Sequence, residues 1–428
     1  MGPGATDLRT RCMTTSYTEL GSWTIALALA SAIGWSSVSH AEEPSPEPHP
    51  DLTTLASTTL SGFVDTSAIW MFGKGQSVYG RSFDQGSNGG SGLNKQDGFN
   101  LDVLSLALEK PLENGEWSAG YRAQLLFGPD ANALGATSTL VPGAPGKSDF
   151  VFEEAYVSLR APVGNGLDFK LGVWRALMGY EAVDTPENVN FSRSYGFFIE
   201  PNIHTGLLAA YKANDILTLT AGVVDRGDGI NTINARPATE SKKSYLAEIG
   251  IIAPEEAGWF RGATASFAVL DGVVSAATPG RGPAGSASVM DYTATATMPT
   301  PLTALSAGLA YDYRANFLFK GSSENAAGLY VLGQATAKLK LADRAEYASG
   351  SKGGPASGGF GAYGVPASAT TGEVRLFENT LTADYSLWSN VVSRVELRWD
   401  HCLNGQRIFG DGNQRNALSL TLNIIYKL

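Results

Sequence analysis

Long hydrophobic stretches are nearly absent from this chain of 428 residues. The longest, residues 23–35, is far too short for a membrane-spanning helix, which needs about 20 consecutive apolar residues. No later segment reaches that length, although 43% of all residues are hydrophobic. The sequence therefore excludes a helical membrane protein. It does not exclude a membrane β-barrel, which carries its apolar residues in alternation rather than in runs.

Cysteine and histidine are also scarce, with two and four residues respectively. Cys12 precedes the apolar run, so Cys402 alone remains after export and cannot form an intrachain disulfide. His204 and His401 make no metal-ligand set by themselves, and the other two histidines precede residue 50. No nucleophile elbow or phosphate-binding loop is present. We therefore expect no enzyme, metal or cofactor, and the net charge of -10 argues against nucleic acid as a partner.

The N-terminus has the features of a secretory signal. Arg9 and Arg11 precede the apolar run, and the small-x-small sequence 39–41 follows it. This arrangement predicts a signal peptide over residues 1–41, cleaved after Ala41. Met13 is an alternative start, but it would discard both arginines, so Met1 is preferred.

Residues 42–56 are proline-rich, with four prolines at alternate positions between 44 and 50. Such spacing favours an extended, unpaired chain, so we expect a periplasmic lead-in. From residue 57 to residue 428, strand signals recur between polar or glycine-rich loops, and no further domain boundary is visible.

The last eleven residues alternate between apolar and polar side chains. One face carries Leu418, Leu420, Leu422, Ile424, Tyr426 and Leu428, and the other Ser419, Thr421, Asn423 and Lys427. Since successive strand side chains point to opposite faces, this is a strand with one apolar and one polar side. A half-buried strand of a soluble sandwich would look the same. In the other alternating segments, however, the polar face mixes both charge signs with small residues, as an aqueous lumen requires.

About sixteen segments have strand character. They are residues 59–71, 98–110, 116–128, 150–161, 167–175, 205–213, 216–225, 243–253, 259–271, 288–298, 302–314, 327–340, 343–349, 373–386, 390–401 and 416–427. Several match the 9–11 residues that cross a bilayer at a tilt. Tight turns and long glycine-rich loops join them, which is the asymmetry of outer-membrane barrels. The sequence thus predicts an all-β fold, a transmembrane antiparallel up-and-down β-barrel of about 16 strands, with both termini on the periplasmic side.

The segment 172–206 lacks the two-residue period. It contains Gly179-Tyr-Glu181, then Asn188-x-Asn-Phe-Ser-Arg-Ser-Tyr195, then His204-Thr-Gly206. This pattern resembles the OmpL-like family of bacterial outer-membrane porins, the putative β-barrel porin type 2 group. Segments 60–65 and 395–401 are similar to that family too, and the resemblance covers essentially the whole mature chain. One departure is the last residue, Leu428, where such barrels commonly end on an aromatic residue.

The resemblance implies a bacterial outer-membrane porin for the passive diffusion of small hydrophilic solutes through a water-filled barrel. Its partners would be outer-membrane lipid and the solutes or ions that pass. A homotrimer is common among porins of this size, although no interface strand stands out in the sequence. The alternatives are a non-conducting barrel, or an exported β-sandwich that acts as an adhesin, an anchor or a carbohydrate-binding module.

A long inward-folding loop near residues 178–204 would narrow the lumen, and its charges would select solutes. The residues expected at this constriction are Arg175, Glu181, Asp184, Glu187, Arg193 and His204. Those expected to line the lumen are Arg122, Glu154, Arg160, Lys170, Arg394 and Arg398. A purely structural alternative stays open, in which Glu181 and Arg193 form an ion pair that pins the loop. Adjacent strand residues face opposite ways, so Glu153 and Glu154 are not expected to act together.

Overall fold

The computed structural model describes residues 57–72, 97–134, 149–227, 242–273, 288–302, 304–316, 321–351, 373–409 and 413–428. The signal peptide and the proline-rich lead-in that the sequence predicts lie outside these residues. Within them, no helix is long and apolar enough to cross a membrane.

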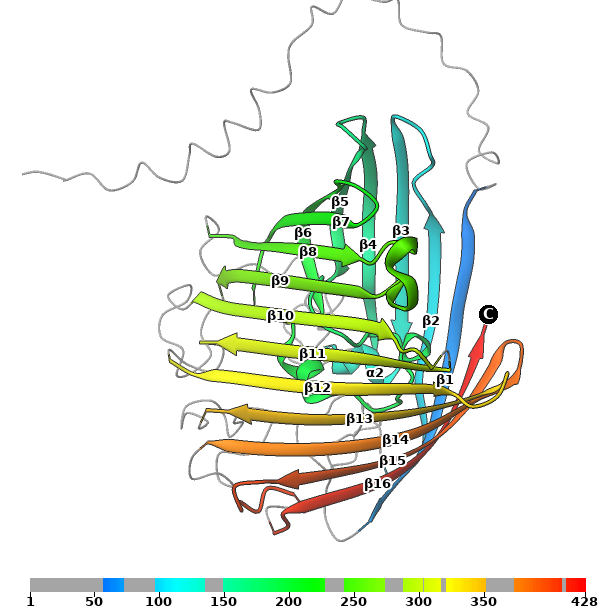
Figure 1. Cartoon of the computed structure of the whole chain (residues 1–428), viewed down its shortest axis with the longest axis vertical. Helices are drawn as coiled ribbons and strands as arrows, with labels where there is room; N and C mark the ends of the chain where they lie inside the picture. The colour runs from blue at the N-terminus through cyan, green and yellow to red at the C-terminus, as the bar shows by residue number, and fades with distance from the viewer. Residues whose placement is uncertain are drawn as a thin grey trace, which may run out of the picture. The chain divides into compact units, whose positions relative to one another are not determined.

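The described residues form sixteen strands that close into one antiparallel barrel (Figure 1). Each strand pairs with its neighbours in sequence, and β1 pairs with β16 to close the sheet. The strands are β1 Thr59–Phe72, β2 Gly98–Lys110, β3 Ser118–Phe127, β4 Phe150–Ala161, β5 Leu167–Arg175, β6 Ile203–Lys212, β7 Leu217–Val224, β8 Ser244–Ile252, β9 Thr264–Val273, β10 Ser288–Pro299, β11 Leu305–Ala315, β12 Ser323–Gln334, β13 Leu339–Gly350, β14 Val374–Trp388, β15 Val391–Cys402 and β16 Asn416–Lys427. The predicted all-β, antiparallel barrel of about 16 strands is confirmed.

The alternation of side chains decides which face each residue takes. On β16, Leu422 and Ile424 are 41% and 52% exposed, whereas Thr421 and Asn423, which alternate with them, are buried. The apolar face therefore points outward, where a membrane barrel meets lipid, and the polar face points into the barrel. The same division holds on β15, where Val395 and Leu397 are exposed.

The strand boundaries agree with the sequence prediction to within about three residues, except at the predicted strands 327–340, 343–349 and 259–271. The predicted strand 327–340 is wrong, because β12 ends at Gln334 and β13 begins at Leu339. Thr336 makes the turn between them by accepting hydrogen bonds from the backbone amides of Lys338 and Leu339. The predicted strand 259–271 begins too early, because a 3-10 helix, η2 (Glu255–Phe260), occupies its start.

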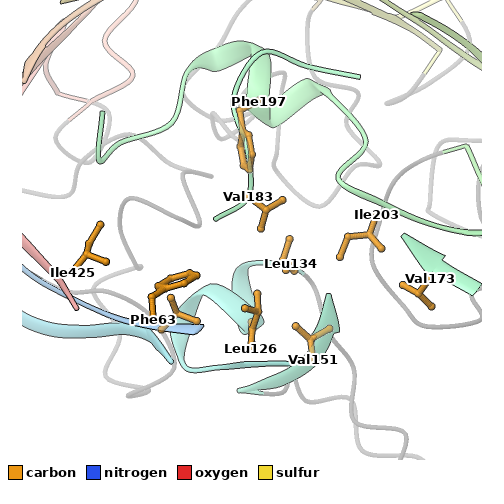
Figure 2. Packing of buried hydrophobic residues seen from close by; sticks show 11 residues of the cluster. Phe63, Leu126, Leu134, Val151, Val173, Val183, Phe197, Ile203 and Ile425 are labelled. Atoms are coloured by element: carbon orange, nitrogen blue, oxygen red, sulfur yellow. The ribbon is translucent and has the colours of Figure 1, made fainter. Parts of the chain in front are cut away.

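The barrel interior also contains apolar clusters. In the largest, residues from the strands pack against residues from the β3–β4 and β5–β6 connections (Figure 2). Leu134 follows the short helix α2 (Pro129–Ala133), and Phe197 lies in the short helix α3 (Tyr195–Ile199). Figure 2 shows Val183 and Phe197 above Leu126 and Phe63 of the strands. Burial of these side chains holds the β5–β6 connection inside the barrel.

Candidate pore constriction

The β5–β6 connection, residues 176–202, crosses the barrel interior, and we call it the lumen loop. Its backbone is bound by carboxylates that point inward from the wall. Glu396 of β15 accepts hydrogen bonds from the amides of Phe191 and Ser192, at 2.6 and 2.9 Å. Glu346 of β13 accepts from the amides of Tyr195 and Gly196 at the start of α3. Each carboxylate satisfies two backbone donors of an irregular segment that has no strand partner.

Arginines of the wall bind the lumen loop as well. Arg344 of β13 pairs with Glu181 at 2.6 Å and with Glu378 at 2.5 Å, and all three side chains are buried. Arg394 and Arg398 of β15 donate to backbone carbonyl groups of the loop, at Asn188 and Arg193 respectively. Charge-assisted hydrogen bonds of this kind fix the loop to β13–β15.

Arg175, at the end of β5, joins several carboxylates on the other side of the loop. Its guanidinium group pairs with Glu153 at 2.6 Å and with Glu187 at 3.2 Å, and also with Asp184. Glu154 lies 3.8 Å away. One network therefore joins Arg175, Glu153 and Glu154 of the strands to two loop carboxylates, those of Asp184 and Glu187. Such a network is expected for a loop that folds back on the wall.

The prediction that Glu153 and Glu154 face opposite ways is wrong. Gln124 of β3 pairs with Glu154, and the next residue, Leu125, pairs with Phe152. Glu153 is thus the extra residue of a β-bulge, which turns its side chain to the same side as Glu154. Both carboxylates are buried.

The remaining residues expected at the constriction have structural contacts. Arg193 is buried and donates to the carbonyl groups of Phe191 and Val183, at 2.8 and 2.7 Å, so it braces the lumen loop from within. His204 is buried on β6, with its ring 5.5 Å from that of Trp174. Glu181 forms its ion pair with Arg344. Among the six, Glu187 has the most open side chain described, at 52% exposure.

The residues expected to line the lumen also differ in accessibility. Arg394 and Arg398 are buried in ion pairs with Asp384 and Asp400. Arg122, near the end of the barrel that carries the short turns, pairs with both Glu109 and Glu154. The other two are more open: Arg160 pairs with Asp168 at 2.6 Å, and the Lys170 ammonium group lies 4.7 Å from the Tyr156 ring.

One buried acid pair was missed by the sequence analysis. Glu200, at the end of the lumen loop, forms a hydrogen bond with the carboxyl group of Asp312 on β11. Burial raises the pKa of Glu200 well above its ordinary value, and the nearby Asp312 carboxylate raises it further. Two carboxyl groups share a hydrogen bond only when one holds a proton. Only the placement of the loop beside β11 brings the two together, 112 positions apart in the sequence, so no local signal predicts this pair.

Two cavities flank the lumen loop. One of about 330 Å³ lies between Tyr180 of the loop and the hydroxyl groups of Thr295, Thr297 and Ser306 on β10 and β11. The other, of about 320 Å³, is lined by residues of β1–β3, by the end of β16 and by the loop. Glu187 borders both cavities. In the described part of the chain, no group of three or more His, Cys, Asp or Glu side chains is arranged to hold a metal ion.

A closed barrel with an apolar exterior, a charged interior and a loop folded inside defines an outer-membrane channel protein. The sequence matches a family model over residues 57–428, and the chain belongs to that family, described as putative beta-barrel porin-2, OmpL-like. It is therefore a porin of the bacterial outer membrane, and both the family and the fold are those of a channel rather than an enzyme. Among curated proteins, none is significantly similar in sequence.

Solved structures of outer-membrane proteins share the fold. The OprB structure from Pseudomonas putida has 11% identity and a TM-score of 0.57, with 88% of this chain and 96% of that one covered. The outer membrane channel DcaP of Acinetobacter baumannii has 13% identity and a TM-score of 0.53, covering 87% and 97%. An anion-selective porin from Comamonas acidovorans has 13% identity and a TM-score of 0.50, covering 87% and 99%. Identities this low establish a common architecture and leave the solute open.

Proposed function

We propose that solutes pass between the part of the lumen loop around Tyr180 and the wall of β10–β11. This wall presents small and hydroxyl side chains, among them Thr295, Thr297 and Ser306, to the cavity beside Tyr180. In contrast, the side of the loop that faces β13–β15 is occupied by ion pairs and backbone hydrogen bonds. The open route therefore follows the hydroxyl-lined part of this wall, and small hydrophilic solutes fit its hydroxyl groups.

We propose further that this route prefers cations. Among the buried side chains described, acids outnumber arginines, and the residues lining the cavity beside Tyr180 include carboxylates and no lysine or arginine. Glu187 is the carboxylate that carries this proposal, because it is half exposed and borders both cavities. The anion-selective porin from Comamonas acidovorans has a similar fold, so this fold does not impose a preference for cations, and we assign the preference to the charges at the constriction.

The test is single-channel recording of the protein, purified from outer membranes, in a planar bilayer with a salt gradient. Stable open steps with a reversal potential of cationic sign are expected. Glu187→Gln should move the reversal potential toward zero. Glu255→Gln is the matched control, because Glu255 is an exposed acid in the turn between β8 and β9, outside the lumen. A wild-type channel that prefers anions would contradict the charge preference.

A barrel closed by its own loop is the second candidate. The apolar clusters inside the barrel and the dense anchoring of the lumen loop favour it. Folded, inserted protein that gives no conductance steps would establish this closed barrel and exclude the open porin.

We also propose that residues 1–41 are a signal peptide removed on export and that residues 42–56 are a periplasmic lead-in to the barrel. Mass spectrometry of the protein from outer membranes is expected to give an N-terminus at Glu42. We propose a homo-oligomer in the membrane, and subunit counting decides between the homotrimer expected from the family resemblance and a two-fold dimer.

A further inference from the structure

A carboxyl group faces the lipid side of the barrel on β13. Arg344 points into the lumen, where it pairs with Glu181 and Glu378. The register of β13 with β14 is continuous, so the preceding residue, Asp343, points outward. Asn379 of β14 lies beside it on the same outer face, and its side-chain nitrogen donates to Asp343 Oδ1 at 2.6 Å.

This polar pair lies in the middle of the apolar band. On the same outer face, Tyr385 is at the level of Leu339, four residues before Asp343, and Tyr347 is four residues after it. A strand rises about 3.3 Å per residue, so at a tilt near 40° each aromatic lies roughly 10 Å from Asp343 along the membrane normal. Aromatic residues mark the two membrane interfaces, which leaves Asp343 and Asn379 between them in the hydrocarbon region.

Two charged residues on the outer face of the described strands, Asp271 and Arg375, lie near strand ends instead. Asp271 lies two residues from the end of β9, and Arg375 is the second residue of β14. An ionisable group within the hydrocarbon region is costly and marks a functional contact by default. Asp343 and Asn379 satisfy one another only in part, because Asp343 Oδ2 and Asn379 Oδ1 accept no hydrogen bond from the described residues. Lipid tails offer no donor, and lipid headgroups lie at the level of the aromatic residues.

We infer that the Asp343–Asn379 pair is the centre of a two-fold contact between two copies of this chain. A carboxyl group beside an amide is self-complementary, so under a two-fold axis along the membrane normal each carboxyl meets the amide of the other copy. The axis keeps both barrels in the same orientation in the membrane. Ala345 and Ala383 flank the pair on the outer face, and their small side chains let the two walls approach.

In this contact the polar pair is buried away from lipid. It is surrounded by apolar side chains that are exposed on the single chain. The nearest are Leu341 and Leu381, which are 49% and 50% exposed on the same strands. A polar centre with an apolar surround is the arrangement that fixes register between membrane proteins, because a shifted contact would leave the polar groups in lipid. This inference is independent of whether the lumen conducts.

The test is disulfide cross-linking of the protein produced in a bacterial outer membrane and reconstituted into phosphatidylethanolamine–phosphatidylglycerol vesicles. Asp343→Cys should give a cross-linked dimer on mild oxidation. Ala221→Cys is the matched control, because Ala221 is also on the outer face in the middle of a strand, on β7. The wild type serves as a second control, since its own Cys402 is buried. A cross-link no faster at Asp343 than at Ala221 would overturn the inference.

Subunit counting by single-molecule photobleaching in the same vesicles gives a second readout. Two bleaching steps are expected for the wild type and one for the double variant Asp343→Leu, Asn379→Leu, with barrel folding verified by heat-dependent gel mobility. A wild type that is monomeric, or a trimer that persists in the folded double variant, would show that this pair does not join two copies. If the double variant fails to fold, the cross-linking result decides alone.

Discussion

Glu181 of the lumen loop and Arg344 of β13 form an ion pair across the barrel interior, with 2.6 Å between Glu181 Oε1 and Arg344 Nη1. The two residues are 163 positions apart in the sequence. Glu181 also accepts a hydrogen bond from the amide of Ser194, so one carboxylate joins two separate parts of the loop to the wall. This pair therefore couples the position of the loop to the stability of the barrel interior.

Replacing Glu181 by alanine should loosen the lumen loop. Removing one partner of a buried ion pair typically costs about 3–5 kcal/mol, since the other charge stays buried. Here Arg344 keeps Glu378, which reduces the cost. We expect a lower melting temperature and a larger, noisier single-channel conductance. Glu255→Ala, which breaks only an exposed pair with Arg261, should leave both unchanged. Unaltered conductance and melting in Glu181→Ala would show that the pair does not hold the loop.

Replacing Arg175 by methionine should make the channel more cation-selective. The change removes the guanidinium group that pairs with Glu153, Asp184 and Glu187 and leaves their negative charges without that partner. The reversal potential in a salt gradient should therefore move further toward the value for a purely cation-selective pore. Arg261→Met removes the same charge outside the lumen and should have no such effect. A shift toward anions would contradict the placement of this network beside the solute route.

The architecture could be predicted from the sequence because the two-residue alternation of apolar and polar side chains is a local property. β16 illustrates this, since its exposed and buried residues follow the alternation already visible in the sequence. The prediction was wrong where a bulge or a turn interrupts this alternation. The bulge at Glu153 shifts one carboxylate to the other face, and only pairing with β3 reveals it.

Only part of the constriction could be predicted from the sequence. The loss of alternation over 172–206 correctly marked an unusual segment, but several partners of its residues come from strands more than a hundred positions away. Glu396 binds the amides of Phe191 and Ser192, and Asp312 meets Glu200, with no sequence signal linking either pair. The sequence prediction placed Asp343 at the start of the strand 343–349, although β13 begins at Leu339, because the turn before β13 was assigned to the strand 327–340.

The anchoring of the lumen loop should weaken as pH rises. Burial, and then the Asp312 carboxylate, raise the pKa of Glu200, while Glu181 and Glu346 add further negative charge around it. At low pH a proton is shared in the Glu200–Asp312 hydrogen bond and the contact is intact. This stabilisation is fully present below the ordinary range of a glutamate and is lost as pH rises through the raised pKa, because two buried negative charges then repel. We expect conductance to increase as pH rises through the raised pKa of Glu200, which lies well above the ordinary value of a glutamate.

Glu200→Gln separates this effect from other titrations. Glutamine retains the shape and a hydrogen-bond donor but carries no charge, so the conductance of this variant should depend less on pH than that of the wild type. The measurement is single-channel conductance from acidic to mildly alkaline pH with both proteins. An equally steep rise in Glu200→Gln would assign the pH dependence to another group.

Gly179 should not tolerate a side chain. Its φ of +110° is in a region that favours glycine, and a Cβ atom there would lie 2.0 Å from Glu200 Oε2. Gly179→Ala must therefore displace either the loop backbone or the Glu200 carboxyl group, and both movements open the lumen. We expect a larger conductance and a melting temperature lowered by several degrees. Gly258→Ala is the matched control, because Gly258 also has a positive φ, of +64°, but a Cβ atom there meets nothing within 4 Å. Backbone strain alone would affect both variants, whereas release of the loop would change conductance in Gly179→Ala only. Equal conductance in the two variants would mean that the contact between Gly179 and Glu200 does not position the loop.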